Sequence, residues 1–165
     1  MLNIAKVAEA ESKFRIHFQE LCKIEIVIHD ELKEYADGKK LKGNERVGWL
    51  GEIYGKLLLG GTLVADKEEH DIETESGAKV SVKARKGFSA GWQQTSAIPK
   101  ILGTDCPTHL LFVHLNEDYS IDRIWLYKWS DLKNRFKPKT DRGEQRGYIF
   151  SVIERSDEPF IVYRG

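Results

Sequence analysis

Residues 44–85 read NERVGWLGEIYGKLLLGGTLVADKEEHDIETESGAKVSVKAR, and this stretch decides the fold. Its first third predicts an amphipathic helix, because apolar residues recur with a period near 3.6. The apolar positions are Val47, Leu50, Tyr54, Leu57 and Leu58. Gly60 and Gly61 predict the end of the helix, since glycine suits the left-handed conformation that often follows a helix C-terminus.

Three glycines interrupt this helix at Gly48, Gly51 and Gly55. Each costs about 1 kcal/mol relative to alanine in a helix interior. We therefore expect another part of the chain to pack very close to that surface. Glu52 lies one turn from Gly48 and from Gly55, which makes it a candidate functional carboxylate. The alternative is an exposed ion pair between Glu52 and Lys56 at i, i+4 spacing.

The remainder of the stretch predicts three strands. Residues 62–65 form the first, and residues 70–75 and 79–85 form a hairpin. Alternation along the last strand places Ser81, Lys83 and Arg85 on one face and the apolar residues between them on the other. Asp71 and Glu73 share a face by the same parity.

The turn of this hairpin fixes which side chains meet. A two-residue loop would bury the carboxylates against the valines. We therefore predict a three-residue loop, Ser76–Ala78, which pairs Asp71 with Lys83 and places it diagonal to Ser81.

This pattern resembles the PD-(D/E)xK nuclease superfamily, which includes restriction endonucleases and Holliday-junction resolvases. The matching residues are Asp71 for the first acid, Ser81-Val82-Lys83 for the (D/E)xK triplet, and Glu52 for the helix acid that many members carry. The resemblance covers roughly residues 44–128. His70 stands where the name-giving pattern has proline. Ser81 stands where a second acid normally sits, and some restriction enzymes of the superfamily share Ser-x-Lys and recruit a glutamate from elsewhere.

The resemblance implies a metal-dependent DNA endonuclease. Asp71, with Glu52 or Glu73 and the Val82 carbonyl, is then expected to hold Mg²⁺, with Mn²⁺ as a substitute. The ion would generate the attacking hydroxide. Lys83 would orient the water or stabilise charge on the phosphoryl group. One such site cuts one strand, so a homodimer is expected.

Cationic and aromatic residues around the last strand predict contacts to nucleic acid. The predicted phosphate contacts are Lys79, Arg85, Lys86 and Lys100. Trp92 could stack on an unpaired base or could fill the edge of the core. A solvated charged hairpin is the structural alternative to a site here, since cross-strand ion pairs contribute only tenths of a kcal/mol.

Composition limits the class of protein. The chain has 165 residues with 26 lysines and arginines against 26 acids, so any DNA contact must come from a local patch or from dimerisation. Cys22 and Cys106 form no disulfide framework, and no apolar span reaches membrane length. With no signal peptide in the sequence, we expect a cytoplasmic protein that does not enter a membrane. Cys106 and His109 offer two zinc ligands where a structural site needs four.

The predicted fold is α/β: a restriction-endonuclease-like mixed sheet of five or six strands, flanked by helices. Residues 1–43 form an N-terminal helical arm on a core of residues 44–165. Residues 109–115 predict a strand buried on both faces, followed by a strand over 121–127, a short helix from Trp129, and final strands at 148–153 and 160–163. Residues 140–147, TDRGEQRG, predict a mobile polar loop.

Two other functions fit the sequence. The first is a nuclease fold that has lost catalysis at Ser81 and binds nucleic acid or a protein. The second is an interaction domain unrelated to nucleic acid, which the zero net charge favours.

Overall fold

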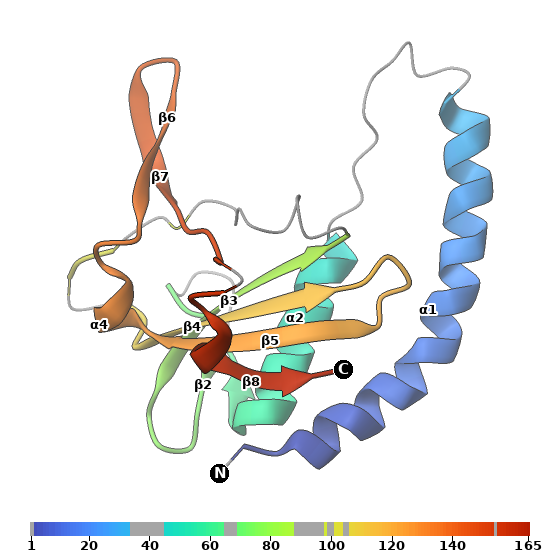
Figure 1. Ribbon diagram of the computed structural model, residues 1–165, viewed down its shortest axis with the longest axis horizontal. Coiled ribbons are helices and arrows are strands. Elements are labelled where there is room, and N and C mark those ends of the chain that lie inside the picture. Colours follow the sequence, from blue (N-terminus) through green and yellow to red (C-terminus); the bar gives the residue numbers. More distant parts are fainter. Residues whose placement is uncertain are drawn as a thin grey trace.

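A mixed sheet of six strands in the order β1-β2-β3-β4-β5-β8 forms the centre of the computed structural model (Figure 1). The structure describes residues 2–33, 45–64, 69–87, 98, 101–103, 106–153 and 155–165. The elements are α1 (Ile4–Lys33), α2 (Glu45–Leu59), β1 (Thr62–Leu63), β2 (Ile72–Glu73), β3 (Lys79–Lys86), β4 (His109–Leu115), β5 (Ile121–Lys128), α4 (Trp129–Leu132), β6 (Lys137–Asp141), β7 (Glu144–Ile149), the 3-10 helix η1 (Glu158–Phe160) and β8 (Ile161–Arg164). The predicted mixed sheet is confirmed.

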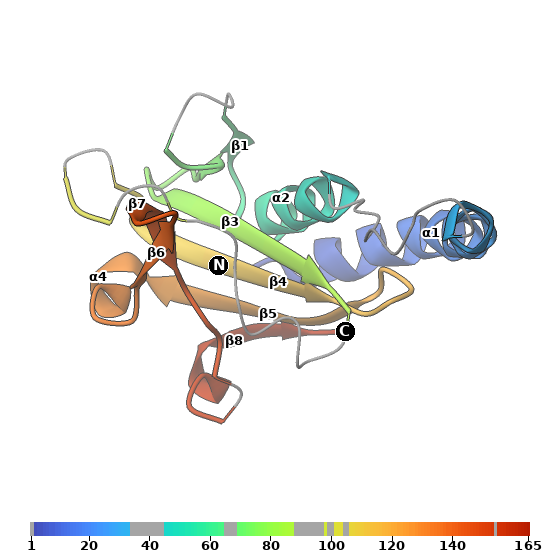
Figure 2. The ribbon, with the colours of Figure 1, turned by 90° about the horizontal axis from the view of Figure 1, so that it is seen from above.

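Each face of the sheet carries its own apolar core, because β4 is buried on both sides as its continuous apolar sequence predicts. On one face, Val82, Leu111 and Val113 pack with residues of α2 and with Val7 of α1. On the other face, a second cluster contains Leu110, Phe112, Ile98, Trp125, Tyr127, Trp129, Leu132, Phe136, Phe150 and Val152. Figure 2 shows α2 over the first face and α1 extending past the sheet.

Helix α2 approaches β3 and β4 more closely than any residue with a side chain would permit. A Cβ atom added to Gly51 would lie 2.6 Å from Ala84 Cβ, and one added to Gly55 would lie 2.7 Å from Leu111 Cδ2. The expected close packing is therefore confirmed at these two glycines. It is wrong for Gly48, where an added Cβ meets no atom within 4 Å.

The predicted register of the β2–β3 hairpin is wrong by two residues. Glu73 pairs with Lys79 and Ile72 with Val80, so Asp71 comes opposite Ser81 rather than Lys83. The loop is longer than predicted because Thr74 closes it: the Ala78 amide donates to Thr74 Oγ1 at 2.9 Å, and the Thr74 amide donates to the Ala78 carbonyl. A shift of two preserves side-chain parity, so Asp71 still shares a face with Ser81 and Lys83.

Helix α1 confirms the predicted N-terminal helix over residues 4–33, including the ambiguous segment 24–28. Its first half packs on the core through Val7, Phe14 and Phe18. Its second half carries the exposed side chains of Ile24 and Val27, each 57% accessible. No described helix combines the length and the apolar character that a membrane span requires.

Residues 137–149 form a two-stranded hairpin, β6 and β7, that is separate from the main sheet. The prediction of a mobile loop at 140–147 is therefore wrong, and the predicted strand at 148–153 ends at Ile149. Figure 1 shows this hairpin projecting beyond the body of the molecule. At its base, Arg135 donates to both carboxylate oxygens of Asp157 at 2.7 Å, and Asp157 is 1% exposed.

The glycines of α2 give a matched pair of variants. Gly51→Ala should lower the free energy of unfolding by about 1–3 kcal/mol, because the added methyl group overlaps Ala84. Gly48→Ala should be neutral or raise it by up to about 1 kcal/mol through helix propensity. Urea unfolding of both variants measures the difference, and equal stability would contradict the close approach of α2 to β3.

Candidate active site at the edge of strand β3

Asp71 anchors the site because its carboxylate is fixed against the neighbouring strand. The residue lies just before β2, and its amide donates to the Val80 carbonyl at 2.9 Å. Its Oδ2 accepts the Val82 amide at 2.5 Å and the Ser81 hydroxyl at 3.4 Å. Ser81 is only 6% exposed. These bonds hold the carboxylate beside β3, at the point where β3 stops pairing with β2.

The edge of β3 beyond this point has no partner strand among the described residues. Strand β2 pairs with β3 only at Lys79 and Val80, whereas β4 pairs with β3 from Val80 to Lys86 on the other side. In a strand, the amide and carbonyl of one residue point to the same side. The Val82 carbonyl therefore points to the same open edge as the Asp71 carboxylate.

A cleft of about 310 Å³ lies between this edge and the first turn of α2. It is lined by Val47, Gly48, Val82, Lys83, Ala84, Arg85 and Lys86. Gly48 borders open space rather than a packed neighbour, so its missing side chain keeps the cleft wide. Lys83 is half-buried and lines the cleft. Among the described residues, no ion pair joins it to Asp71.

The predicted metal ligands are brought together only in part. Both hydrogen bonds of the Asp71 side chain reach Oδ2, which leaves Oδ1 with the Val82 carbonyl as oxygen donors at the edge. Glu52 is half-buried on α2, and Glu73 is exposed on β2. Within the described ranges, no three His, Cys, Asp or Glu side chains gather as a metal-binding group, Glu52, Asp71 and Glu73 included.

This donor set fits a loosely held Mg²⁺ better than a tightly bound transition metal. Magnesium uses one or two carboxylates and keeps several water ligands. One carboxylate oxygen and one backbone carbonyl at an open edge match that requirement, whereas a structural zinc site needs four protein ligands. Cys106 and His109 likewise join no such group in the described part of the chain.

The predicted phosphate contacts lie in three different settings. Arg85 and Lys86 line the cleft. The Lys86 amine lies 4.0 Å from the Tyr119 ring centroid and 4.0 Å from Glu25 of α1, so it also ties β3 to the arm. Lys79 is four residues before Lys83, about 13 Å along the strand, and its backbone pairs with Thr108. Trp92 and Lys100 lie outside the described residues.

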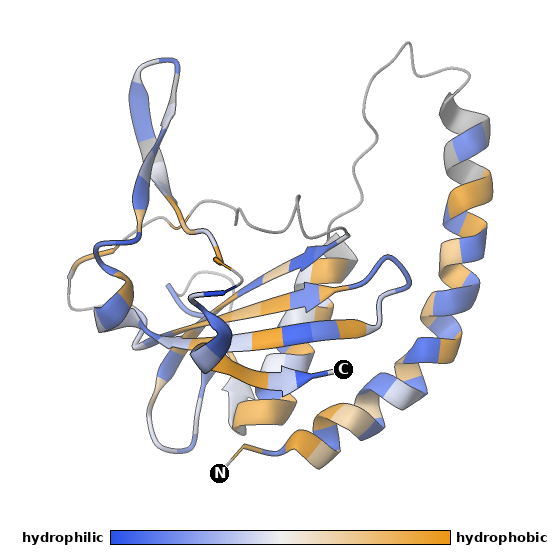
Figure 3. Ribbon diagram, viewed as in Figure 1, coloured by the Kyte–Doolittle hydropathy of each residue, from blue (hydrophilic) through white to orange (hydrophobic). Residues whose placement is uncertain are grey.

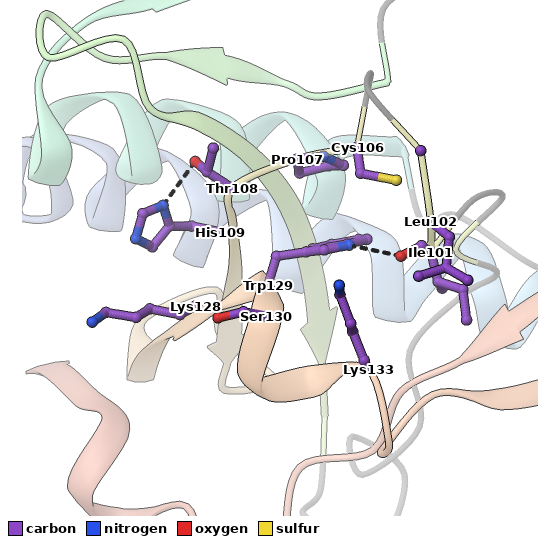
Figure 4. A pocket seen from close by; sticks show the side chains of 11 residues that line it. Ile101, Leu102, Cys106, Pro107, Thr108, His109, Lys128, Trp129, Ser130 and Lys133 are labelled. Carbon is purple, nitrogen blue, oxygen red and sulfur yellow. Dashed lines mark hydrogen bonds between the residues drawn. The ribbon is translucent and has the colours of Figure 1, made fainter.

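A larger cavity of about 410 Å³ lies elsewhere, where β4 begins and β5 meets α4 (Figure 4). Its wall includes His109, Lys128, Trp129 and Lys133. Burial, and secondly the Lys128 ammonium, lower the pKa of His109. A neutral imidazole and two exposed lysines supply no carboxylate, so this cavity lacks the oxygen ligands of a magnesium site.

Two parts of the site escaped the sequence reasoning. Val47 and Gly48 form the helix wall of the cleft, although the glycine pattern was interpreted only as close packing. The second part is the Val82 amide, which holds Asp71 in place of the expected contact with Lys83. The sequence signal for the helix wall of the cleft was Gly48, a third glycine in the same helix as two that allow close packing.

No model of a known protein family matches the chain, and a comparison with curated proteins found no relative.

The Asp71 carboxylate should contribute to stability as well as to chemistry. Asp71→Ala leaves the part-buried Val82 amide without its acceptor, which should cost about 1–3 kcal/mol of unfolding free energy. Asp71→Asn keeps an oxygen in the same place and should cost less. Glu73→Ala, an exposed carboxylate two residues on, is the control and should change stability by under about 0.5 kcal/mol. Chemical denaturation of the three variants distinguishes these outcomes.

Proposed function

We propose that the protein is a metal-dependent DNA endonuclease of the restriction-endonuclease-like type. The observation that supports this best is the Asp71 carboxylate, bonded to Val82 at an open strand edge and next to a cleft that Lys83 lines. Asp71 is bonded to Val82 and Ser81 of β3, and Lys83 follows directly on the same strand, which supports the PD-(D/E)xK resemblance.

Each side chain has a distinct role in this proposal. Asp71 Oδ1 and the Val82 carbonyl would hold Mg²⁺ or Mn²⁺, with Glu52 as the further carboxylate from α2. The bound ion would supply a water of lowered pKa for attack on phosphorus. Ser81 orients Asp71 through its hydroxyl and replaces the usual second acid.

Lys83 supplies fixed positive charge beside the reacting phosphate. A preorganised cation in a site with limited water stabilises the charge that develops on the phosphoryl oxygens. Arg85 and Lys86 extend the positive wall of the same cleft toward the end of β3. One cleft offers one set of groups, so cleavage of both strands requires a homodimer.

A catalytically inactive nucleic-acid-binding module is the second candidate. It is favoured by the lack of a three-ligand group among the described residues. It is disfavoured because no ion pair between Lys83 and Asp71 closes the edge. The two candidates differ in turnover, not in DNA binding.

Nicking of supercoiled plasmid in Mg²⁺ or Mn²⁺ tests the proposal. The wild-type protein should convert plasmid to open circles, and EDTA should stop the reaction. Lys83→Ala and Asp71→Asn should each lower the rate by at least about 100-fold, since removal of one preorganised group typically costs that much. Glu73→Ala should nick at the wild-type rate, because the proposal assigns the further carboxylate to Glu52 and not to Glu73. Equal nicking by Lys83→Ala and the wild-type protein would exclude the site.

The role of Glu52 is tested separately by calorimetry with Mn²⁺. Glu52→Gln should weaken Mn²⁺ binding about 10-fold or more while the fold remains intact. The near-isosteric amide keeps the helix surface unchanged, and circular dichroism serves as the control. Wild-type affinity in this variant would assign the further ligand to another residue.

A further inference from the structure

The β6–β7 hairpin projects from the body of the molecule (Figure 1), and the proposed chemistry does not use it. Its side chains at 137–140 and 142–145 are exposed wherever the structure describes them. It belongs to a separate two-stranded sheet. Figure 3 shows mostly hydrophilic residues along its length. An isolated two-stranded hairpin is marginally stable in water, so its projection without an apolar face points to a binding role.

The base of the hairpin is rigid although the hairpin itself stands free. Arg135 makes its two bonds to the buried Asp157 and a third to the Ser151 carbonyl at 2.9 Å. Phe136 and Phe150, which flank the hairpin in sequence, are both buried in the second core. Tyr148 forms a backbone bridge with Ile98. The hairpin is therefore held in a defined direction at the end of the sheet.

The tip of the hairpin places an arginine in a strained backbone conformation. Arg142 has φ 52° and Gly143 has φ 85°, so both residues of the turn lie in the left-handed region. Such a turn favours Asn-Gly or Asp-Gly, and a left-handed residue other than glycine costs about 1 kcal/mol. Arginine offers the turn no conformational advantage over asparagine, so its guanidinium at the tip is better explained by binding.

The charge and chemistry of the hairpin select nucleic acid over protein. Residues 137–149 contain four cations and two acids in a chain whose total charge is zero. None of the exposed large apolar side chains of the described residues lies in this segment, whereas protein interfaces concentrate their energy in buried aromatic and apolar groups. Thr140 and Gln145 lie directly opposite each other on one face near the tip. Threonine and glutamine hydrogen-bond to base edges in the major groove.

The position of the hairpin relative to the cleft fits one continuous duplex. Lys128, which precedes α4 and the hairpin, pairs with His109, and His109 pairs with Val80 at the start of β3. The cleft lies at the other end of β3. Strand β3 itself is about 23 Å long, about the length of seven base pairs of duplex. Figure 1 shows the hairpin projecting from the end of the sheet at which β3 begins.

We propose that the β6–β7 hairpin is a DNA-binding ribbon that enters the major groove of duplex DNA, with Arg142 at its tip and Thr140 and Gln145 facing the bases. The major groove is about 12 Å wide and admits a two-stranded ribbon. The deep, narrow major groove of duplex RNA does not. This inference rests on the proposed function for its substrate and adds to it the element that binds the duplex away from the cut.

Fluorescence anisotropy with a labelled DNA duplex in Ca²⁺ tests the inference while cleavage is suppressed. Arg142→Asn combined with Lys139→Gln should bind about 10-fold more weakly at moderate salt, with a shallower dependence on salt by about 1–2 in the log–log slope. Asparagine suits the left-handed turn, so this variant should be as stable as the wild type. Lys6→Gln, an exposed lysine on α1, is the matched control and should bind as the wild type does.

Two further measurements distinguish the mode of binding. Unlabelled duplex RNA of the same sequence should compete at least about 10-fold less well than duplex DNA. Thr140→Ala with Gln145→Ala should reduce the preference for a DNA site selected from a random library, with an unchanged salt slope. Equal competition by RNA, or an unchanged affinity in the Arg142 and Lys139 variant, would overturn the inference.

The failure of this inference is distinguishable from the failure of the proposed function. Nicking that depends on Lys83, together with unchanged DNA binding by the hairpin variant, would support the proposed nuclease function. It would exclude the DNA-binding role of the β6–β7 hairpin. If the wild-type protein nicks no DNA but the hairpin variant binds DNA more weakly than the wild type, the DNA-binding role of the hairpin is supported and the proposed nuclease function is excluded.

Discussion

The close approach of α2 to the sheet is the constraint on which the rest of the structure depends. Gly51 and Gly55 let the helix backbone lie against Ala84, Leu111 and Ile72. Because side chains at these two positions would push the helix outward, the approach fixes where the first turn of α2 meets the end of β3. The third glycine, Gly48, has no neighbour to accommodate and instead leaves space. One sequence pattern therefore both brings the helix to the strand and opens the cleft next to it.

The second feature that connects structure with chemistry is an edge of β3 that has no partner strand among the described residues. Unpaired edges invite association with other strands, and proteins protect them with charged residues. Here β2 is only two residues long, and the Asp71 carboxylate satisfies the Val82 amide that β2 does not reach. Lys83, Arg85 and Lys86 follow along the same edge. The same groups that protect this edge also place an acid, a carbonyl and cations along one strand, and groups of these kinds can bind metal and phosphate.

Charge is distributed unevenly over a chain whose net charge is zero. Acids and bases balance over the whole sequence, and Lys86 is partly occupied by Glu25 and Tyr119 on the arm side. Among the described residues, cations lie together in the cleft toward the end of β3 and along the β6–β7 hairpin. Buried pairs such as Arg135 with Asp157 serve the architecture instead, because a buried charge without its partner is strongly destabilising.

The sequence by itself determined the elements whose signal is local. The 3.6 periodicity of α2, the continuous apolar run of β4 and the alternation of β3 needed no tertiary information, and the parity that puts Asp71 and Lys83 on one face survived an error in register. Tertiary structure decided the rest. The hydrogen bonds of Thr74 set the loop length, which no count of residues between strands reveals. The polar segment 140–147 has no apolar alternation, so its hairpin became visible only through the positive φ angles of Arg142 and Gly143 and the anchors at its base. The role of Gly48 depended on whether another chain segment faced it, because a missing side chain gives close packing or open space according to its surroundings alone.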